Sequence, residues 1–264
     1  MLTVSELAVY PMKSCRQLTA DSWNVDSFGF AGDRRWVVVD SKTGIFVSQR
    51  THPQMVKIIC LPIVGGISLS HPDMNRIEVV VPGSRSIVQA TVWDDTCDAW
   101  DAGEDAASWC SEVIGKPCRL VYMPDSTFRQ VDRAYAEEGV RTSFADGFPF
   151  LVISEASLEL LNSKLDDTIP MKRFRPNIVI KGCEPHAEDN WKRIRIGDIE
   201  FSGVKLCTRC VMTTVDTETA EKSPEPLRTL AKYRRLNNKV IFGQNMIHHG
   251  TGGISKGMSV EILE

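Results

Sequence analysis

Short apolar segments broken by turn residues dominate the first hundred residues of the chain. They are rich in β-branched residues and separated by Gly, Pro, Asn and Asp, which predicts the strands of an antiparallel barrel or sandwich. The predicted strands are 4–10, 36–39, 45–48, 56–61, 67–70, 77–81 and 87–92. Residues 104–114 differ, because their apolar side chains recur at helical spacing and Gly115 and Pro117 end the pattern.

The second half opens with a polar stretch, residues 123–147, that shows little periodicity and predicts a linker or a long active-site loop. Strands alternate with two short helices beyond it, one capped by Ser154 and one opened by Pro226. The predicted strands are 150–153, 178–180, 194–196, 199–201, 211–215, 240–242 and 258–263. The pattern therefore predicts a β-dominated chain with a few packed helices.

Composition narrows the class of protein without naming a function. The chain has 264 residues, of which 42% are hydrophobic and 25% charged, so disorder and disulfide-dependent miniature folds are excluded. A net charge of -3 gives no global sign of nucleic acid or of an anionic membrane as a partner. The N-terminus lacks the pattern of a signal peptide, and no apolar run has the length of a bilayer span. We therefore expect a cytoplasmic protein with neither a nucleic-acid nor a membrane partner.

Among the eight cysteines, only Cys207 and Cys210 have the spacing of metal ligands. A thiol acts as ligand or nucleophile when it is a thiolate, and the guanidinium of Arg209 between the two cysteines favours that form. The same spacing also fits two half-buried cysteines that share a turn, or a redox pair. A second cysteine pair, which a structural zinc site would need, is absent from the sequence.

Polar side chains next to strands supply further candidates. They are Lys13, Ser14, Arg34, Arg175, Asn177 and Asn245. The ammonium and hydroxyl of Lys13-Ser14 suit a phosphate, although a solvated lysine explains that pair about as well. Arg175 can grip a phosphate with two hydrogen bonds, and the Asn177 amide can read the edge of a heterocycle. For Arg34 a surface salt bridge is an equally good explanation.

These motifs together resemble a known family. The segments YPMKSC, GDRRW, SFADGFPFLVISEASL, FRPNIVI, CTRCVMTTVD, EPLRTLAKYR and FGQN occur in this order over nearly the whole chain. They resemble the MOSC-domain molybdenum proteins, above all the YcbX-like branch and the related mitochondrial amidoxime-reducing component. The resemblance implies a β-dominated α+β fold, with an N-terminal MOSC-associated β-barrel domain (1–122) and a C-terminal MOSC β-barrel domain (123–264). It also implies a molybdenum–molybdopterin cofactor (Moco) and the reduction of hydroxylamines, amidoximes and N-hydroxylated purines.

The family motifs also imply roles for single residues. Cys210 matches the cysteine that ligates molybdenum, and Asp146 matches an acidic residue close to the metal and is a candidate proton donor. The residues that match cofactor contacts are Lys13, Ser14, Arg34, Arg175, Asn177, Thr208 and Arg209. Asn245 stands where the eukaryotic branch has an aromatic residue, and Phe148 replaces a small polar residue, so substrate contacts here are expected to differ.

The sequence has no iron–sulfur spacing, flavin motif or nucleotide-binding loop. We therefore expect small N-hydroxylated substrates and electrons from a separate flavin reductase or ferredoxin-type donor. Two other hypotheses remain open. One is a non-catalytic Moco carrier or sulfur-relay protein that uses Cys210, and the other is a thiol redox protein that uses Cys207 and Cys210.

Overall fold

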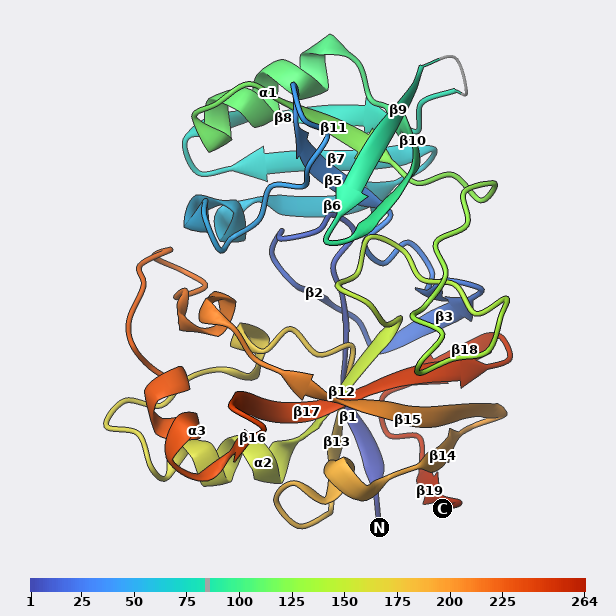
Figure 1. Ribbon diagram of the computed structural model, residues 1–264, viewed down its shortest axis with the longest axis vertical. Coiled ribbons are helices and arrows are strands. Elements are labelled where there is room, and N and C mark those ends of the chain that lie inside the picture. Colours follow the sequence, from blue (N-terminus) through green and yellow to red (C-terminus); the bar gives the residue numbers. More distant parts are fainter. Residues whose placement is uncertain (84–85) are drawn as a thin grey trace.

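Strands are the main regular structure of the chain, as the sequence pattern predicts, and they gather in two lobes (Figure 1). The computed structural model describes residues 1–83 and 86–264. The N-terminal lobe contains two antiparallel sheets. One sheet has the order β5 (Trp36–Asp40), β11 (Cys118–Tyr122), β10 (Asp95–Asp101) and β9 (Ile87–Val92). The other has the order β6 (Ile59–Ile63), β7 (Gly66–His71) and β8 (Met74–Val80).

The predicted helix of the N-terminal lobe is present as α1 (Glu104–Ile114). Its buried face presents Trp109 and Cys110 to a core that contains Trp36, Leu69 and Leu120. The helix ends at Gly115, which adopts a left-handed φ of 80° that costs glycine little. Burial of this apolar stripe between the helix and the strands is what anchors α1 to the lobe.

The C-terminal lobe is built on a curved nine-stranded sheet. Its order is β19 (Val260–Ile262), β14 (Arg193–Ile196), β15 (Ile199–Thr208), β17 (Lys239–His249), β12 (Phe150–Ser154), β13 (Ile178–Lys181), β1 (Thr3–Val9) and β2 (Leu18–Thr19), with β16 (Arg235–Leu236) paired to β17. A small sheet of β18 (Gly252–Ser255), β3 (Ser22–Asp26) and β4 (Gly29–Phe30) adjoins it. Pairing is antiparallel except between β12 and β13.

The first strand of the chain belongs to the C-terminal lobe. β1 pairs with β13, and β3 pairs with β18 near the end of the chain. From β1 the chain passes at Lys13 into the N-terminal lobe, where the Lys13 amide donates to the Trp36 carbonyl at 2.8 Å. Residues 1–30 therefore include strands of the C-terminal lobe, although the expected N-terminal domain was 1–122. The boundary between residues 122 and 123 stays a prediction.

Helices cover one face of the large sheet. Successive residues of β12 point to opposite faces, so Phe150 and Val152 enter one core while Leu151 and Ile153 enter another. The second core also holds residues of α2 (Glu155–Asn162) and α3 (Leu227–Tyr233). α2 begins at the predicted cap, where the Ser154 side chain accepts from the Ser157 amide.

Three predicted strand segments are wrong in whole or in part. Residues 211–215 form η4 (Val211–Thr214), because the Thr213 and Thr214 hydroxyls donate to the carbonyls three residues before them at 3.1 and 2.7 Å. Residues 45–48 make only isolated bridges, and residues 56–57 end η1 (Pro53–Lys57). The other short 3₁₀ helices are η2 (Met171–Arg173) and η3 (Ala187–Asn190).

The polar stretch 123–149 crosses between the lobes as a long loop without helix or strand (Figure 1). The side chain of Arg129, which is 4% exposed, makes hydrogen bonds to the backbone of this loop. Its Nη1 donates to the Ser143 and Ala145 carbonyls at 2.8 and 2.6 Å, and its Nε donates to Asp95 on β10 at 2.9 Å. These bonds fix the backbone next to Asp146. Among the described residues, no helix is long and apolar enough to cross a membrane.

A fully buried carboxylate ties α2 to the sheet. Glu188 of η3 is 0% exposed and accepts from the Ser154 amide at 3.1 Å, from the Ser154 hydroxyl at 2.8 Å and from the Ser157 hydroxyl at 2.7 Å. These donors are themselves buried, so each needs an acceptor inside the protein. The carboxylate thus accepts hydrogen bonds from the buried donors at the start of α2.

We predict that Glu188→Gln lowers the free energy of unfolding by about 1.5–3 kcal/mol, because an amide cannot accept all three hydrogen bonds and a charge-assisted contact is lost. Urea unfolding would measure the change. Glu159→Gln, on the exposed side of α2, is the matched control and should change stability by no more than about 0.5 kcal/mol. Equal stability of the two variants would contradict the role given to Glu188.

Candidate functional site

A cavity of about 830 Å³ lies between the two lobes. Every residue that the sequence singled out lines it. These residues are Lys13, Ser14, Arg34, Asp146, Arg175, Asn177, Thr208, Arg209, Cys210 and Asn245. The fold thus brings side chains from both ends of the chain and from the long loop together, while their individual roles stay predictions.

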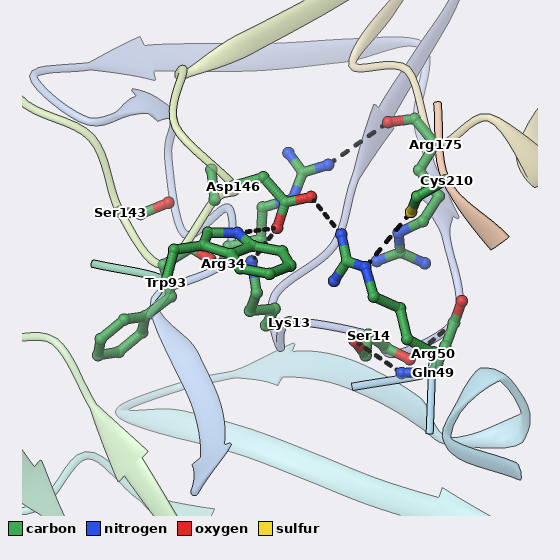
Figure 2. A network of polar contacts seen from close by, with 12 residues as sticks. Lys13, Ser14, Arg34, Gln49, Arg50, Trp93, Ser143, Asp146, Arg175 and Cys210 are labelled. Carbon is green, nitrogen blue, oxygen red and sulfur yellow. Dashed lines mark hydrogen bonds and ion pairs between the residues drawn. The ribbon is translucent and has the colours of Figure 1, made fainter. Parts of the chain in front are cut away.

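Asp146 lies at the centre of the polar contacts in the cavity (Figure 2). One carboxylate oxygen accepts from Lys13 Nζ at 2.6 Å and from the indole N–H of Trp93 at 3.3 Å. The other accepts from Arg50 Nη2 at 3.0 Å. Lys13 also donates to the Phe144 carbonyl at 2.7 Å, so the lysine joins the long loop to the end of β1. The Asp146 side chain remains 54% exposed and faces the cavity.

These contacts shift the pKa values of both Lys13 and Asp146. Burial lowers the pKa of Lys13 to about 8, although the Asp146 carboxylate opposes that shift. Burial alone would raise the pKa of Asp146, but Lys13 and Arg50 hold it well below its ordinary range. Asp146 is therefore an ionised hydrogen-bond acceptor. The expected role of Asp146 as a proton donor stays a prediction.

The two candidate cysteines face different guanidinium groups. Cys210 follows β15 and caps η4, and its sulfur accepts from Arg50 Nε at 3.3 Å (Figure 2). Cys207 instead accepts from Arg209 Nη1 at 3.0 Å, and Arg209 Nη2 donates to the Phe174 carbonyl at 2.6 Å. Burial raises the pKa of the Cys207 thiol, against the opposing effect of Arg209. The guanidinium that contacts the Cys210 sulfur is thus that of Arg50, from the other lobe, and not that of Arg209, its neighbour in sequence.

Arg34 and Arg175 stack against the ring of Tyr10, with guanidinium carbons 4.5 and 4.0 Å from its centroid. Arg34 pairs with Asp33, and its Nη1 also donates to the Asn177 side-chain oxygen at 3.0 Å. Arg175 donates to the Cys15 carbonyl at 2.6 Å. The two arginines therefore contact the segment where the chain passes between the lobes, and they also line the cavity.

Three other predicted residues contact the surrounding protein in different ways. The Asn177 amide nitrogen donates to the Ala8 carbonyl at 3.2 Å, and its oxygen accepts from the Leu151 amide at 3.3 Å. Ser14 is 1% exposed, and its hydroxyl accepts from the Gln49 amide at 3.3 Å. Asn245 sits on β17 between β12 and β15, opposite Leu151. Reading of a heterocycle by Asn177 stays a prediction, since protein groups contact both ends of its amide.

Thr208 is the last residue of β15 and is exposed to the cavity. It directly precedes the Arg209-Cys210 pair, so the end of this strand fixes where both side chains begin.

Further cavity residues gave no local signal in the sequence. Arg50, Trp93 and Arg173 line the cavity, but Arg50 and Trp93 lie in loops and Arg173 ends η2, so only the tertiary contacts identify them. Within the described residues, Arg50 Nη1, Arg173 Nε and Arg209 Nε are buried and have no hydrogen-bond partner. Several guanidinium groups line the cavity, so it is suited to an anionic group next to Cys210.

Comparisons with known proteins identify both halves of the chain. The family model described as "MOSC N-terminal beta barrel domain" matches residues 1–117, and the one described as "MOSC domain" matches residues 139–261. "Mitochondrial amidoxime-reducing component 1" of Mus musculus is 36% identical, over 99% of this chain and 82% of its own length. The Homo sapiens protein of that name is 32% identical, over 99% and 83%. "Molybdenum cofactor sulfurase" of Oryza sativa subsp. japonica is 30% identical, over 91% of this chain but 32% of its own length.

We predict that Asp146→Asn moves the pKa of Lys13 below about 8, because the carboxylate is the group that offsets the effect of burial. Nuclear magnetic resonance of the lysine ε-carbon, followed against pH, would measure the shift. Asp40→Asn, which removes the partner of the half-exposed Lys116, is the control and should leave Lys13 unchanged. A raised pKa of Lys13 in Asp146→Asn would contradict the assignment.

Proposed function

This chain belongs to the family of proteins that join a MOSC N-terminal β-barrel domain to a MOSC domain, and we propose that it reduces N-hydroxylated compounds with a molybdenum cofactor. One observation carries the proposal. Cys210, the ionised Asp146 and several arginine side chains line one cavity. The names of its relatives support the same chemistry, since they refer to amidoxime reduction and to the molybdenum cofactor.

The donors in the cavity fit a phosphate-bearing, sulfur-rich metal cofactor. Cys210 offers a soft thiolate of the kind that suits a high-valent metal with sulfur ligands. Arg173 and Arg209 line the same cavity, and the planar N–H donors of a guanidinium suit a phosphate. We assign Cys210 to the metal. To the organic part of the cofactor and its phosphate we assign Lys13, Ser14, Arg34, Arg175, Asn177, Thr208, Arg209 and Asn245.

The reaction that we propose converts an N–OH group into N–H. The substrate takes up two electrons and two protons, the N–O bond breaks, and the oxygen leaves as water. When bound, the cofactor supplies the two electrons. The chain supplies position and protons: Asp146 accepts an N–H of the substrate, and Lys13 Nζ, with a pKa of about 8, holds a proton beside it at neutral pH.

The electron donor is a second protein in this proposal. The sequence contains no iron–sulfur, flavin or nucleotide motif, so a flavin reductase or a ferredoxin-type protein would deliver the electrons. Such encounters use small and transient interfaces, and a donor must approach the cavity closely. The substrates would be small N-hydroxylated molecules, which match a cavity of about 830 Å³.

A second candidate function deserves a test because of the sulfurase relatives. Several molybdenum cofactor sulfurases match more than nine-tenths of this chain at 30–32% identity. The chain could then carry the cofactor, or relay sulfur as a persulfide on Cys210, without reducing a substrate. The two functions differ in turnover, because a carrier or relay protein reduces no N-hydroxylated compound.

We predict that Cys210→Ser abolishes reduction of benzamidoxime and that Cys207→Ser keeps most of it. A hard alkoxide replaces a soft thiolate poorly, and only Cys210 contacts Arg50. Molybdenum content and the rate with chemically reduced viologen, measured on protein from a cofactor-competent host, would show the effect. Equal loss in both variants, with a disulfide between the two cysteines in the parent protein, would instead support a thiol redox pair.

We predict that the purified protein turns over benzamidoxime or N-hydroxyadenine with reduced viologen but not with NADPH alone. Viologen delivers electrons directly to an accessible metal, whereas NADPH needs a flavin that the proposal places in another protein. Added flavin reductase or ferredoxin system should confer dependence on NADPH, and salt should slow that coupled rate more than the viologen rate. Turnover with NADPH alone would refute the separate donor. Loaded protein without turnover under any donor would favour the carrier or relay.

A further inference from the structure

Trp93 occupies an unusual backbone position at the edge of the cavity. It follows β9 in a two-residue turn, and Val92 pairs with Asp95 across that turn. Its φ is 59°, in the left-handed region that bulky residues rarely adopt. Glycine is the residue that such turns favour, because it has no Cβ to clash with the backbone. A tryptophan in this place carries a conformational cost that the turn itself does not require.

The side chain of Trp93 is nevertheless held in a defined orientation over the cavity (Figure 2). Its indole N–H donates to Asp146 at 3.3 Å, and the Arg50 guanidinium carbon lies 4.5 Å from the indole ring centroid. Phe46 packs against the indole edge-to-face, with centroids 5.0 Å apart. Even so, Trp93 remains 45% exposed while lining the cavity. A large rigid apolar surface is therefore left open beside an ionised carboxylate.

A second aromatic residue lines the same cavity from the long loop. Phe148 lies two residues after Asp146, and it packs edge-to-face against Tyr135 with ring centroids 5.7 Å apart. Lys205 of β15 caps this pair, with its Nζ 4.2 Å from the Tyr135 ring centroid. Aromatic surface from Trp93 and Phe148 thus accompanies Asp146 in the cavity.

We propose that Trp93 is a specificity-determining residue that stacks on the planar aromatic part of the substrate and so selects aryl over small aliphatic N-hydroxylated compounds. This inference rests on the proposed function and adds a residue to it. Asp146 accepts the N–H next to the N–OH group, and the indole that donates to the same carboxylate lies alongside the plane of the bound molecule. An aromatic ring gains from such stacking, whereas a methyl group in its place does not.

The experiment compares two ligands that differ only outside the amidoxime group. Benzamidoxime carries a phenyl ring where acetamidoxime carries a methyl group. Isothermal titration of the cofactor-loaded protein without reductant measures binding apart from turnover. We expect Trp93→Ala to weaken benzamidoxime binding about two- to tenfold and acetamidoxime binding less than about twofold. Trp93→Phe keeps an aromatic ring and should keep most of the preference for benzamidoxime.

Two further variants separate selection from stability. Phe128 is also an exposed aromatic residue, at 51%, and is not among the described residues that line the cavity, so Phe128→Ala should change neither affinity. Trp93→Gly removes the left-handed clash together with the indole, so its Tm should stay within about 4 °C of the parent while the preference is lost. A large fall in Tm with an unchanged preference would mean that Trp93 serves the fold alone.

The outcomes also separate this inference from the proposed function. Reduction of both amidoximes by the parent protein, with equal effects of Trp93→Ala on the two affinities or none on either, would overturn the inference and leave the function standing. Failure of the parent protein to reduce either compound with reduced viologen would refute the function. The titration would still report whether Trp93 selects the aryl ligand.

Discussion

The ion pair between Lys13 and Asp146 joins the two lobes at the centre of the cavity, and the other contacts of the site depend on it. Lys13 is 5% exposed, and an ammonium buried to that degree needs a partner. Asp146 supplies it from a loop that has no regular structure of its own. The carboxylate then has a second oxygen for Arg50, and Arg50 in turn reaches the Cys210 sulfur. One buried charge thus fixes a carboxylate, a guanidinium and a thiol in relation to each other.

The cavity concentrates positive charge in a chain whose net charge is -3. Arg34 is neutralised by Asp33, and Arg173 by Asp216 at 2.9 Å. Each guanidinium offers five N–H donors in a planar fork, however, so one carboxylate does not exhaust them. The Nε of Arg173 and of Arg209 remain without a partner in the described chain. The global charge therefore sets long-range attraction, while the arginine side chains that line the cavity set what it can hold.

Backbone strain gathers around the same cavity. Ser14, Arg34, Trp93 and Arg175 all have a left-handed φ, between 48° and 70°, and all line the cavity. Such residues persist where the surrounding structure fixes them strongly. Here the fixing contacts are the crossing of the chain between the lobes, the stack of two guanidinium groups on Tyr10 and the bond from the indole to Asp146. The apolar cores of the two lobes stabilise the fold and so offset the energetic cost of this strain.

Local patterns in the sequence were sufficient for features that depend on neighbours along the chain. The helix at 104–114, the Ser154 cap and the irregular loop after residue 123 follow from periodicity, capping and composition, which are properties of short segments. The prediction of a strand at 211–215 was wrong because the Thr213 and Thr214 hydroxyls donate to nearby backbone carbonyls. Apolar content alone does not reveal that such bonds compete with strand formation.

Local motifs and the family resemblance together also found ten cavity residues, because the family signature records a site whose parts are far apart in sequence. What only the tertiary structure decided is which groups meet. It placed Arg50 rather than Arg209 on Cys210, set Trp93 beside Asp146, and made that carboxylate an ionised acceptor. The reason is physical: a pKa and a hydrogen-bond partner depend on distance, burial and charge in space, and residues 160 positions apart in the chain acquire these only when it folds.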